Sequence, residues 1–312
     1  MSYPKRSEAA RAATHGQATM PFRALVTLAA ATLATTPAFA GGMIAYELGT
    51  ADVGLASAGY NVRAQDASTV FTNPAGMTRL QGTQAVASGQ LLWNSTRYSI
   101  DSGSSPDLGR NEGGYAVGSN GWFPGGGALI SHSVSPDLKV SFALAGNFGA
   151  PLKYDNDWAG RYYIQSTTLL GLSLVPSVAY KVNDKLSLGA GLNAMYGIYQ
   201  DQVAINNPNP AFGDGRLKYD DNTWGWGANL GLLYEIDEGT RIGLTWNSQV
   251  NLDFKATPKF SGLSPLVASG LNKAGLLDSQ LKIGITVPQQ AMLSVFTQLD
   301  PQWAALGSVG WQ

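Results

Sequence analysis

Apolar and polar residues alternate with a period of two along three long segments in the second half of the chain, 186–199, 224–236 and 242–254. In each segment one face has large apolar side chains, and the other has glycine or polar residues. This period is typical of a β-strand, whose successive side chains point to opposite sides. The apolar faces consist of Leu186, Leu188, Ala190, Leu192, Ala194, Tyr196 and Ile198; Trp224, Trp226, Ala228, Leu230, Leu232, Tyr234 and Ile236; and Ile242, Leu244, Trp246, Val250, Leu252 and Phe254.

Similar but less regular runs extend this pattern over most of the chain. We place nine strands, at approximately 83–98, 123–134, 139–149, 167–182, 185–200, 223–236, 240–254, 281–297 and 302–312. The clearest of them run past ten residues, which exceeds the ~5–6 residues of a typical soluble strand. A strand that crosses a bilayer at a tilt needs ~9–11 residues. The lengths therefore predict strands that span a membrane.

The connections between these strands alternate in length. Tight polar turns occur at 135–137, 183–185, 237–239 and 299–301, and long irregular stretches occur at 99–121, 149–166, 200–222 and 255–280. Outer-membrane barrels have short turns on the periplasmic side and long loops on the outside. A soluble β-sandwich would also show the alternation, but strand length and this rhythm favour an all-β fold, an antiparallel transmembrane β-barrel.

The number of strands also bears on how much of a barrel the sequence contains. A barrel must close to remove its edges, and bacterial single-chain barrels have even strand numbers. Here the ninth strand is cut off at Gln312. We expect 83–312 to be part of a larger barrel, since a small barrel with an irregular end would need the alternation to stop for a structural reason.

The first forty residues have the features of a signal peptide. Four basic residues precede an apolar run at 24–34, and Ala38, Phe39 and Ala40 form an A-x-A cleavage site. The apolar run is shorter than the roughly 20 residues of a membrane anchor. We therefore expect 1–40 to be removed on export and the mature chain to begin at Gly41.

Composition narrows the classes of function. The mature chain has 16 basic and 20 acidic residues, a net charge of −4, which argues against a nucleic-acid partner. Charged residues make up 13% of the sequence, against ~25% in ordinary soluble domains. With 38 glycines, 13 tyrosines and 8 tryptophans, this composition favours strands that meet the bilayer.

No enzymatic motif is found. The mature chain has one histidine, His132, and its neighbours Ser131 and Ser133 point to the opposite face of a strand, so no serine is placed for activation by this base. The chain has no cysteine, no cluster of metal ligands and no phosphate-binding glycine loop. We expect neither an enzyme nor a cofactor.

Residues 41–82 differ in composition and pattern from the strands that follow. They contain many small residues, and their apolar residues are spaced as in short helices. The segment ends in the turn Asn73, Pro74, Ala75 and Gly76, within FTNPAGM. Pro74 has a fixed φ and disfavours the helical region for Asn73, whose side chain can bond nearby backbone groups. From local chemistry alone, this is a turn before a strand.

Several motifs resemble the FadL-like family of long-chain fatty acid transporters in Gram-negative outer membranes, which includes channels for toluene and related aromatic hydrocarbons. The motifs are DVGLASAG (52–59), AQDASTVFTNPAGMTRL (64–80), WAGRY (158–162), LVPSVAYKVNDKLSLGAGLN (174–193) and TRIGLTWNSQVNLDF (240–254). The resemblance implies a fourteen-stranded barrel, of which about nine strands are present, with 41–82 folded into the lumen as a hatch. It also implies that Asn73, Pro74, Ala75 and Gly76 form the inner turn of this hatch.

The resemblance further implies sideways exit of substrate through a gap where the third strand kinks inward. That strand ends in AGNFGAP, and the kink would fall on Gly146, Asn147, Phe148 and Gly149. Glycine and proline weaken regular pairing, and Asn147 could support a bulge. The residues by themselves are equally compatible with a strand that ends at 149–151.

The stretch 255–280 is apolar for an extracellular loop, and Leu266, Val267 and Leu271 approximate helical spacing. Exposed apolar surface indicates a binding site or a partner, although these side chains could instead pack the loop onto the barrel. The predicted substrate-capture residues are Phe260, Leu263, Leu266, Val267, Leu271, Leu276 and Leu277.

Charged residues in the other loops offer weaker candidates. Asp214, Asp220 and Asp221 could bind calcium, and Lys153 and Arg161 could pair with a substrate head group, but we expect all five to be solvated loop charges.

Together these observations predict an outer-membrane channel for passive uptake of hydrophobic compounds by loop capture, hatch gating and lateral exit. Fatty acids and aromatic hydrocarbons both fit an apolar lining. The expected partners are hydrophobic small molecules and outer-membrane lipids, and the complete protein is expected to be monomeric. The alternative is a structural or adhesive surface barrel that binds a host or phage partner. A polar porin ranks lower, because the inward faces favour Gly, Ser, Asn and Thr over rings of charge.

Overall fold

A computed structural model describes residues 44, 48, 50, 51, 53–95 and 120–312. The expected signal peptide and nearly all of the predicted loop 99–121 lie outside the described residues. Every element below belongs to the unit Gly41–Gln312.

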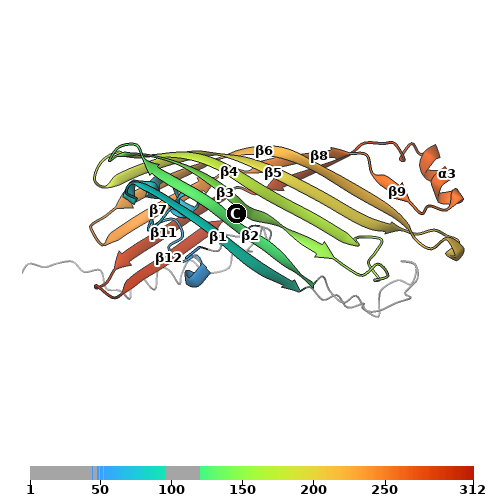
Figure 1. Ribbon diagram of the computed structural model, residues 1–312, viewed down its shortest axis with the longest axis horizontal. Coiled ribbons are helices and arrows are strands. Elements are labelled where there is room, and N and C mark those ends of the chain that lie inside the picture. The colour runs from blue at the N-terminus through green and yellow to red at the C-terminus, as the bar shows by residue number, and fades with distance from the viewer. Residues whose placement is uncertain (1–43, 45–47, 49, 52, 96–119) are drawn as a thin grey trace, which may run out of the picture. The chain divides into compact units, whose positions relative to one another are not determined.

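Long antiparallel strands form one sheet in which neighbours in sequence are neighbours in space (Figure 1). The order is β1-β2-β3-β4-β5-β6-β7-β11-β12, and the short β9 pairs with β6. Within the described residues the edge strands β1 and β12 are not paired with each other. The bounds are β1 Thr83–Ser95, β2 Asn120–Ser133, β3 Leu138–Lys153, β4 Ser166–Lys181, β5 Leu186–Ile205, β6 Gly215–Glu235, β7 Thr240–Asn247, β9 Lys259–Ser261, β11 Gln290–Gln298 and β12 Ala304–Trp311.

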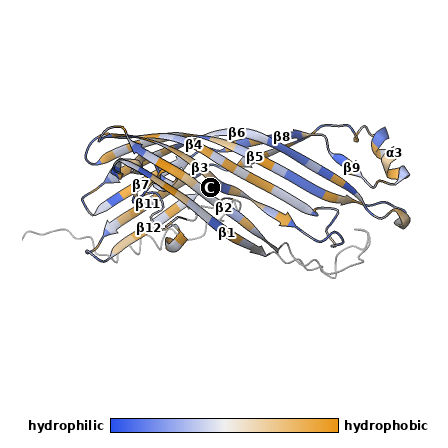
Figure 2. Cartoon of the chain, viewed as in Figure 1, coloured by the Kyte–Doolittle hydropathy of each residue, from blue (hydrophilic) through white to orange (hydrophobic). Residues whose placement is uncertain are grey.

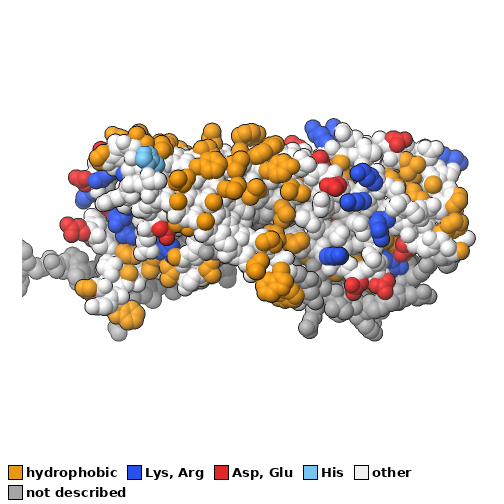
Figure 3. Space-filling model, in the orientation of Figure 1, with side chains coloured by type: hydrophobic (Ala, Val, Ile, Leu, Met, Phe, Trp, Pro, Cys, Tyr) orange, Lys and Arg blue, Asp and Glu red, His pale blue; other side chains and the backbone are white. Residues whose placement is uncertain are grey.

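The two faces of this sheet differ as the alternation predicts. Leu192, Trp226 and Leu230 are at least half exposed on the outer face, whereas Met195 and Leu233 are buried on the inner face. Figure 2 shows apolar and polar positions alternating along the strands. In Figure 3 apolar side chains cover the middle of the visible face, and charged side chains gather towards its two ends. An apolar outer band between polar ends is what a lipid-facing barrel wall requires.

Two predicted strands are each divided in two. The segment 240–254 forms β7 and then β8 (Val250–Ala256), and the segment 281–297 forms β10 (Leu281–Val287) and then β11. β8 and β10 pair with each other in a separate two-stranded sheet, while β7 and β11 pair within the wall. The hairpin therefore breaks at 248–249 and 288–289, which period-two alternation alone did not reveal.

The predicted outward direction of Val250, Leu252 and Phe254 is wrong, because all three are buried in an apolar cluster on the inner side. The β8–β10 ribbon packs on the inner face of β5 and β6, where Gly197 and Gly225 leave room for its side chains. A Cβ on Gly225 would lie 2.5 Å from Val250 Cγ1. Burial of these side chains is favourable because it removes apolar surface from water.

The prediction of a long irregular loop at 200–222 is also wrong. β5 continues to Ile205 and β6 begins at Gly215, and the two remain paired over this whole extension. Only 206–214 connects them, with a short helix η4 (Pro210–Phe212). The extension is polar, so composition suggested a loop, but backbone pairing does not depend on side-chain polarity.

The N-terminal segment forms η1 (Val53–Leu55), α2 (Thr69–Thr72) and η2 (Pro74–Arg79). Val70, Met77 and Leu80 are buried against the inner faces of β2, β3 and β4. At the other end of the sheet, α3 (Pro265–Lys273) follows β9 (Figure 1). None of the helices in the described residues is long and apolar enough to cross a membrane.

Candidate functional site

The FTNPAGM turn lies on the inner face of the wall, and Asn73 is fully buried at its centre. Its Oδ1 accepts a hydrogen bond from the backbone N–H of Ala75 at 3.0 Å and so caps η2. Its Nδ2 donates to the carbonyl oxygens of Asn61 at 2.7 Å and of Leu232 in β6 at 3.1 Å. One side chain thus holds the turn, the preceding segment and the wall together.

Two glycines of the wall allow the turn to approach the strands closely. A Cβ on Gly231 of β6 would lie 2.1 Å from Asn73 Oδ1, and a Cβ on Gly189 of β5 would lie 2.4 Å from the backbone nitrogen of Ala75. Contacts this short are sterically forbidden, so any larger residue would displace the turn. The inward glycines, which the alternation marked as small, are therefore a docking surface.

Arg241 of β7 is a buried anchor that sequence reasoning missed. Its guanidinium donates to the carbonyl oxygens of Val62 at 2.6 Å and Arg63 at 2.9 Å. The same group lies over the ring of Phe296, 3.8 Å from the centroid. Arg241 is the one charged residue on the predicted inner face of TRIGLTWN (240–247). This sequence feature could have identified it as a functional residue.

Asn61 is a second missed anchor. Its Nδ2 donates to Thr245 Oγ1 of β7 at 3.1 Å and to the carbonyl oxygen of Met292 in β11 at 2.7 Å. The N-terminal segment is therefore tied to β6, β7 and β11 by buried side chains.

The predicted kink contains a β-bulge at Asn147. The register between β3 and β4 shifts between Gly146 and Phe148. Gly149 has φ +111°, and a Cβ there would lie 1.8 Å from a carbonyl oxygen of β4. The alternative of a strand that ends at 149–151 is wrong, because β3 continues to Lys153.

Pairing between β2 and β3 stops at this bulge. Their ladder runs from Ser133–Lys139 to Gly126–Gly146, whereas β2 stays paired with β1 to Asn120 and β3 stays paired with β4 to Lys153. Within the described residues the wall is thus open between these two strands beyond Gly146. Ile44 of the N-terminal segment forms a bridge with Phe148 at this opening.

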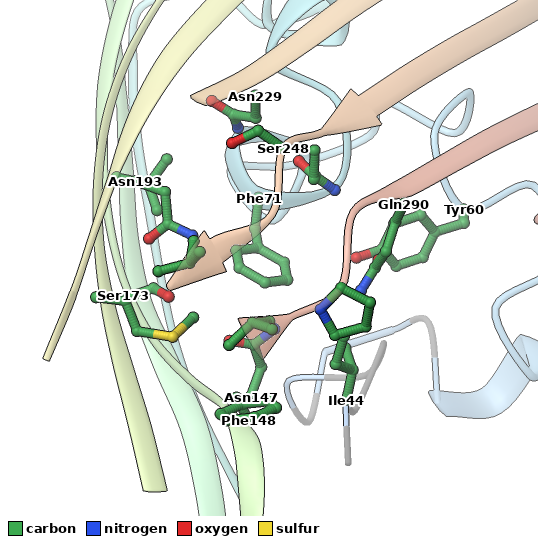
Figure 4. Close-up of a pocket in the computed structure, with 16 residues that line it drawn as sticks. Ile44, Tyr60, Phe71, Asn147, Phe148, Ser173, Asn193, Asn229, Ser248 and Gln290 are labelled. Atoms are coloured by element: carbon green, nitrogen blue, oxygen red, sulfur yellow. The ribbon is translucent and has the colours of Figure 1, made fainter. Parts of the chain in front are cut away.

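A cavity of about 60 Å³ lies beside the bulge, on the inner side of the wall. Figure 4 shows Phe71 of FTNPAGM pointing into it, between Asn193 and Gln290, with Asn147 and Phe148 close by. The bulge, the N-terminal segment and the break in the hairpin therefore meet at one place. Of the predicted kink, Asn147 and Phe148 line the cavity, and Phe71 is two residues before the predicted hatch turn.

The predicted capture residues lie elsewhere, in the loop around α3. Leu266 is 72% exposed and Leu276 is 50% exposed. Phe260, Leu263, Val267, Leu271 and Leu277 are half-buried. Ser264 caps α3 by accepting from the N–H of Val267 at 3.4 Å. The helix agrees with the helical spacing of this loop, and Leu266 is its exposed large apolar side chain.

The neighbouring loops are held by buried polar groups. Asn207 donates to the carbonyl oxygens of Gly213 and Gly262, each at 2.8 Å, and accepts from the N–H of Ser264 at 2.8 Å.

The expectation that Arg161 is solvated is wrong, because it is buried and its Nε donates to Asp214 Oδ2 at 2.7 Å.

Tyr162 completes this loop cluster by donating its hydroxyl hydrogen to Asp214 Oδ1 at 2.8 Å. Burial, together with this hydrogen bond, raises the pKa of Tyr162. Asp214 thus serves as an acceptor for Arg161 and Tyr162, and the described residues contain no cluster of three or more His, Cys, Asp or Glu that could hold a metal. His132 pairs with Thr83 Oγ1 at 2.8 Å near a turn.

An antiparallel meander with an apolar outer face and a folded segment against its inner face has the architecture of an outer-membrane β-barrel protein. A family model described as "Outer membrane protein transport protein (OMPP1/FadL/TodX)" matches residues 31–312. The chain belongs to this family. It is accordingly a protein of the outer membrane, and the family consists of transport proteins, not enzymes.

Two relatives illustrate the similarity in sequence. The chain is 27% identical over 303 residues to a long-chain fatty acid transport protein of Salmonella typhi. This alignment covers 88% of this chain and 66% of that protein. It is 30% identical over 296 residues to outer membrane protein P1 of Haemophilus influenzae. That alignment covers 83% of this chain and 62% of the relative. The chain thus spans less than two thirds of the length of these relatives.

Solved structures share the fold. A Pseudomonas aeruginosa FadL homologue superimposes with a TM-score of 0.68 at 20% identity, over 87% of this chain and 69% of that one. The toluene transporter TbuX of Ralstonia pickettii gives a TM-score of 0.51 at 18% identity, over 81% and 67% of the two chains. At these identities the similarity establishes the barrel fold.

Proposed function

We propose that the protein is a channel for passive uptake of hydrophobic compounds, either long-chain fatty acids or aromatic hydrocarbons, across the outer membrane. The observation that supports this most directly is the end of β2–β3 pairing at the Asn147 bulge, beside an inner cavity. An opening in a lipid-facing wall gives a hydrophobic solute a route sideways into the bilayer.

Lateral exit is favoured because it avoids the free-energy cost of exposing a hydrophobic solute to water. Each CH₂ exposed to water costs ~0.8 kcal/mol, so a chain of twelve would cost roughly 10 kcal/mol if it crossed the periplasm in free solution. Release into the bilayer avoids this cost. In this proposal Gly146, Asn147, Phe148 and Gly149 form the lateral gate.

The N-terminal segment, 41–82, acts as the hatch, and 83–312 forms the wall. The segment bridges to Phe148 through Ile44 and inserts Phe71 into the cavity, so movement of the segment would change access to the opening. Asn73, Pro74, Ala75 and Gly76 seat the hatch on the glycines of β5 and β6. The channel works as a monomer in contact with outer-membrane lipids.

Capture begins at α3 and its flanking loop, whose exposed leucines Leu266 and Leu276 offer an apolar surface at the outer end. Exposed apolar surface on a loop is characteristic of binding sites.

The test is uptake by the full-length protein in vesicles whose outer leaflet is lipopolysaccharide, with a fluorescent fatty-acid-binding reporter inside. We expect uptake above empty vesicles, reduced several-fold by Leu266→Ser with Leu276→Ser. Leu299→Ser is the matched control, because Leu299 is 62% exposed at a turn on the opposite end. Uptake of neither a fatty acid nor toluene above that of empty vesicles would refute the channel, and binding of a cell-surface partner without uptake would support the adhesive alternative.

A further inference from the structure

Exposed cations lie together on the outer face of the wall, at the end of the sheet where α3 follows β9. They are Arg216 and Lys218 of β6 and Lys259 of β9, and we call them the basic patch. Alternate residues of β6 face outwards, as the exposed Trp224 and Trp226 show, and Arg216 and Lys218 fall on the same face. In Figure 3 several Lys and Arg side chains lie between the apolar band and this end of the visible face.

The strand register brings these three cations close together. β9 pairs with β6 so that Lys259 lies directly opposite Lys218, and Ser261 lies opposite Arg216. Side chains directly opposite each other on neighbouring strands have Cβ atoms ~5 Å apart, and diagonal neighbours are ~7–8 Å apart. The three cationic side chains therefore leave the sheet within roughly 8 Å of one another.

The basic patch is short of negative charge. Like charges directly opposite each other destabilise a sheet. Asp220 Oδ2 lies 3.8 Å from Lys218 Nζ, whereas Arg216 and Lys259 form no ion pair in the part of the chain that the structure describes. The neighbouring Asp214 already accepts hydrogen bonds within the loop cluster. An anion from outside the chain would balance the remaining positive charge.

The position of the patch along β6 narrows the identity of that anion. Outward residues of β6 are apolar over the ten steps from Tyr234 to Trp224. At ~3.3 Å per residue and a tilt of ~45°, these steps span ~23 Å of the membrane, close to the ~25 Å apolar band of outer-membrane barrels. Lys218 lies six residues further, which is ~14 Å above the band, and its side chain can reach back towards the band.

The long connections of such barrels face outwards from the cell, so the patch lies in the head-group layer of the outer leaflet. Lipopolysaccharide, the lipid of this leaflet, carries phosphate groups on its sugars. A guanidinium binds phosphate through paired hydrogen bonds, and an ammonium binds it as a point charge. Clusters of Lys and Arg beside a membrane attract anionic head groups in this way.

We propose that the basic patch binds phosphate groups of lipopolysaccharide and fixes this lipid against β6 and β9. A phosphate shared by Lys218 and Lys259 would also hold β9, a strand of three residues, on β6. Since β9 leads into α3, the bound lipid would stabilise the position of the α3 loop. The inference goes beyond the proposed function and does not depend on it, because the patch lies on the outer face of the wall and no step of uptake uses it.

The test is the affinity of the full-length protein in a non-ionic detergent for three lipids, measured by microscale thermophoresis. The probes are rough lipopolysaccharide, the same lipid after removal of its phosphates, and phosphatidylglycerol. We expect intact lipopolysaccharide to bind about tenfold more tightly than either of the others, since each Lys or Arg beside an anionic surface adds close to one factor of ten.

Lys218→Gln with Lys259→Gln locates the effect in the patch. This double variant should lose the tenfold preference for intact lipopolysaccharide. Lys255→Gln with Lys282→Gln is the matched control, because these two exposed lysines also lie directly opposite each other, on the face of the β8–β10 ribbon that points away from the wall. The control should keep the affinity of the wild type.

Both double variants should assemble as heat-modifiable barrels on gels, because neither changes a backbone ladder. Equal affinities of the wild type and the patch variant for intact lipopolysaccharide would overturn the proposal. Equal binding of the intact and dephosphorylated lipids would overturn the role of phosphate. Phosphatidylglycerol bound as tightly as lipopolysaccharide would overturn the choice of a glycolipid as the partner.

Discussion

The attachment of the N-terminal segment to the wall depends on Asn73. Replacing it with alanine removes three hydrogen bonds, from the N–H of Ala75 and to the carbonyl oxygens of Asn61 and Leu232. At about 1 kcal/mol each, their loss weakens the attachment by about 3 kcal/mol. The ladders of the wall do not involve this side chain, so we expect the barrel to assemble normally.

Hydrogen–deuterium exchange of the protein in nanodiscs measures this effect. A loss of about 3 kcal/mol raises the open population roughly 100-fold, since 1.4 kcal/mol is a factor of ten. Amides held by the turn, such as Gly76 N–H bonded to Asn73 O at 3.0 Å, should exchange faster by this factor, while amides of β5 should not change. Uptake should change along with exchange.

Two further variants sharpen the result. Asn73→Asp keeps the acceptor for Ala75 but turns a carboxylate oxygen towards two carbonyl oxygens, so it should be no better than alanine. Asn183→Ala removes a turn cap that accepts from Lys185 and Leu186 at 2.9 Å each, and it should leave the N-terminal segment unchanged. Exchange in Asn73→Ala within threefold of the wild type would refute the reasoning.

Three further predictions concern the wall and the loops. Gly149→Ala should prevent assembly of the heat-modifiable barrel on gels, because φ is +111° and the Cβ would lie 1.8 Å from a carbonyl oxygen. Gly146→Ala should assemble, because the atom nearest to its Cβ would be 3.8 Å away. Gly231→Val should leave the barrel intact but expose the N-terminal segment to protease, because its Cβ would lie 2.1 Å from the Asn73 amide oxygen. Because burial and its hydrogen bond to Asp214 raise the pKa of Tyr162, its contribution to loop stability is present below the ordinary tyrosine pKa of ~10 and is lost as the pH rises through the raised pKa. Loop proteolysis should therefore increase in the wild type as the pH rises above ~10 and increase less in Tyr162→Phe, and equal profiles would contradict this account.

The strands and the faces of β5 and β6 could be predicted from the sequence for a physical reason. A wall between lipid and a polar interior imposes opposite requirements on alternate residues, and these requirements appear directly as a period of two. The cap of η2 was also accessible, because Asn73 bonds to a backbone group only two residues away. Local chemistry was sufficient in both cases.

The break between β7 and β8 could not be predicted in this way. Val250, Leu252 and Phe254 have the same parity as the outward residues of β7, and only the space left by inward glycines on β5 and β6 shows that they turn inside. The same holds for the contact of Asn73 with Leu232, which lie 159 positions apart.

The sequence by itself thus determined that the chain forms long amphipathic strands, preceded by a segment with a turn at FTNPAGM. Only the tertiary structure decided what that turn contacts, where the wall opens and which amides meet in one cavity. The reason is that periodicity reports the environment of each strand, whereas a site is made by residues from strands that become neighbours only after folding. Asn193 and Asn229 are unremarkable in sequence, and they line one cavity together with Asn147 because β3, β5 and β6 surround one space after folding.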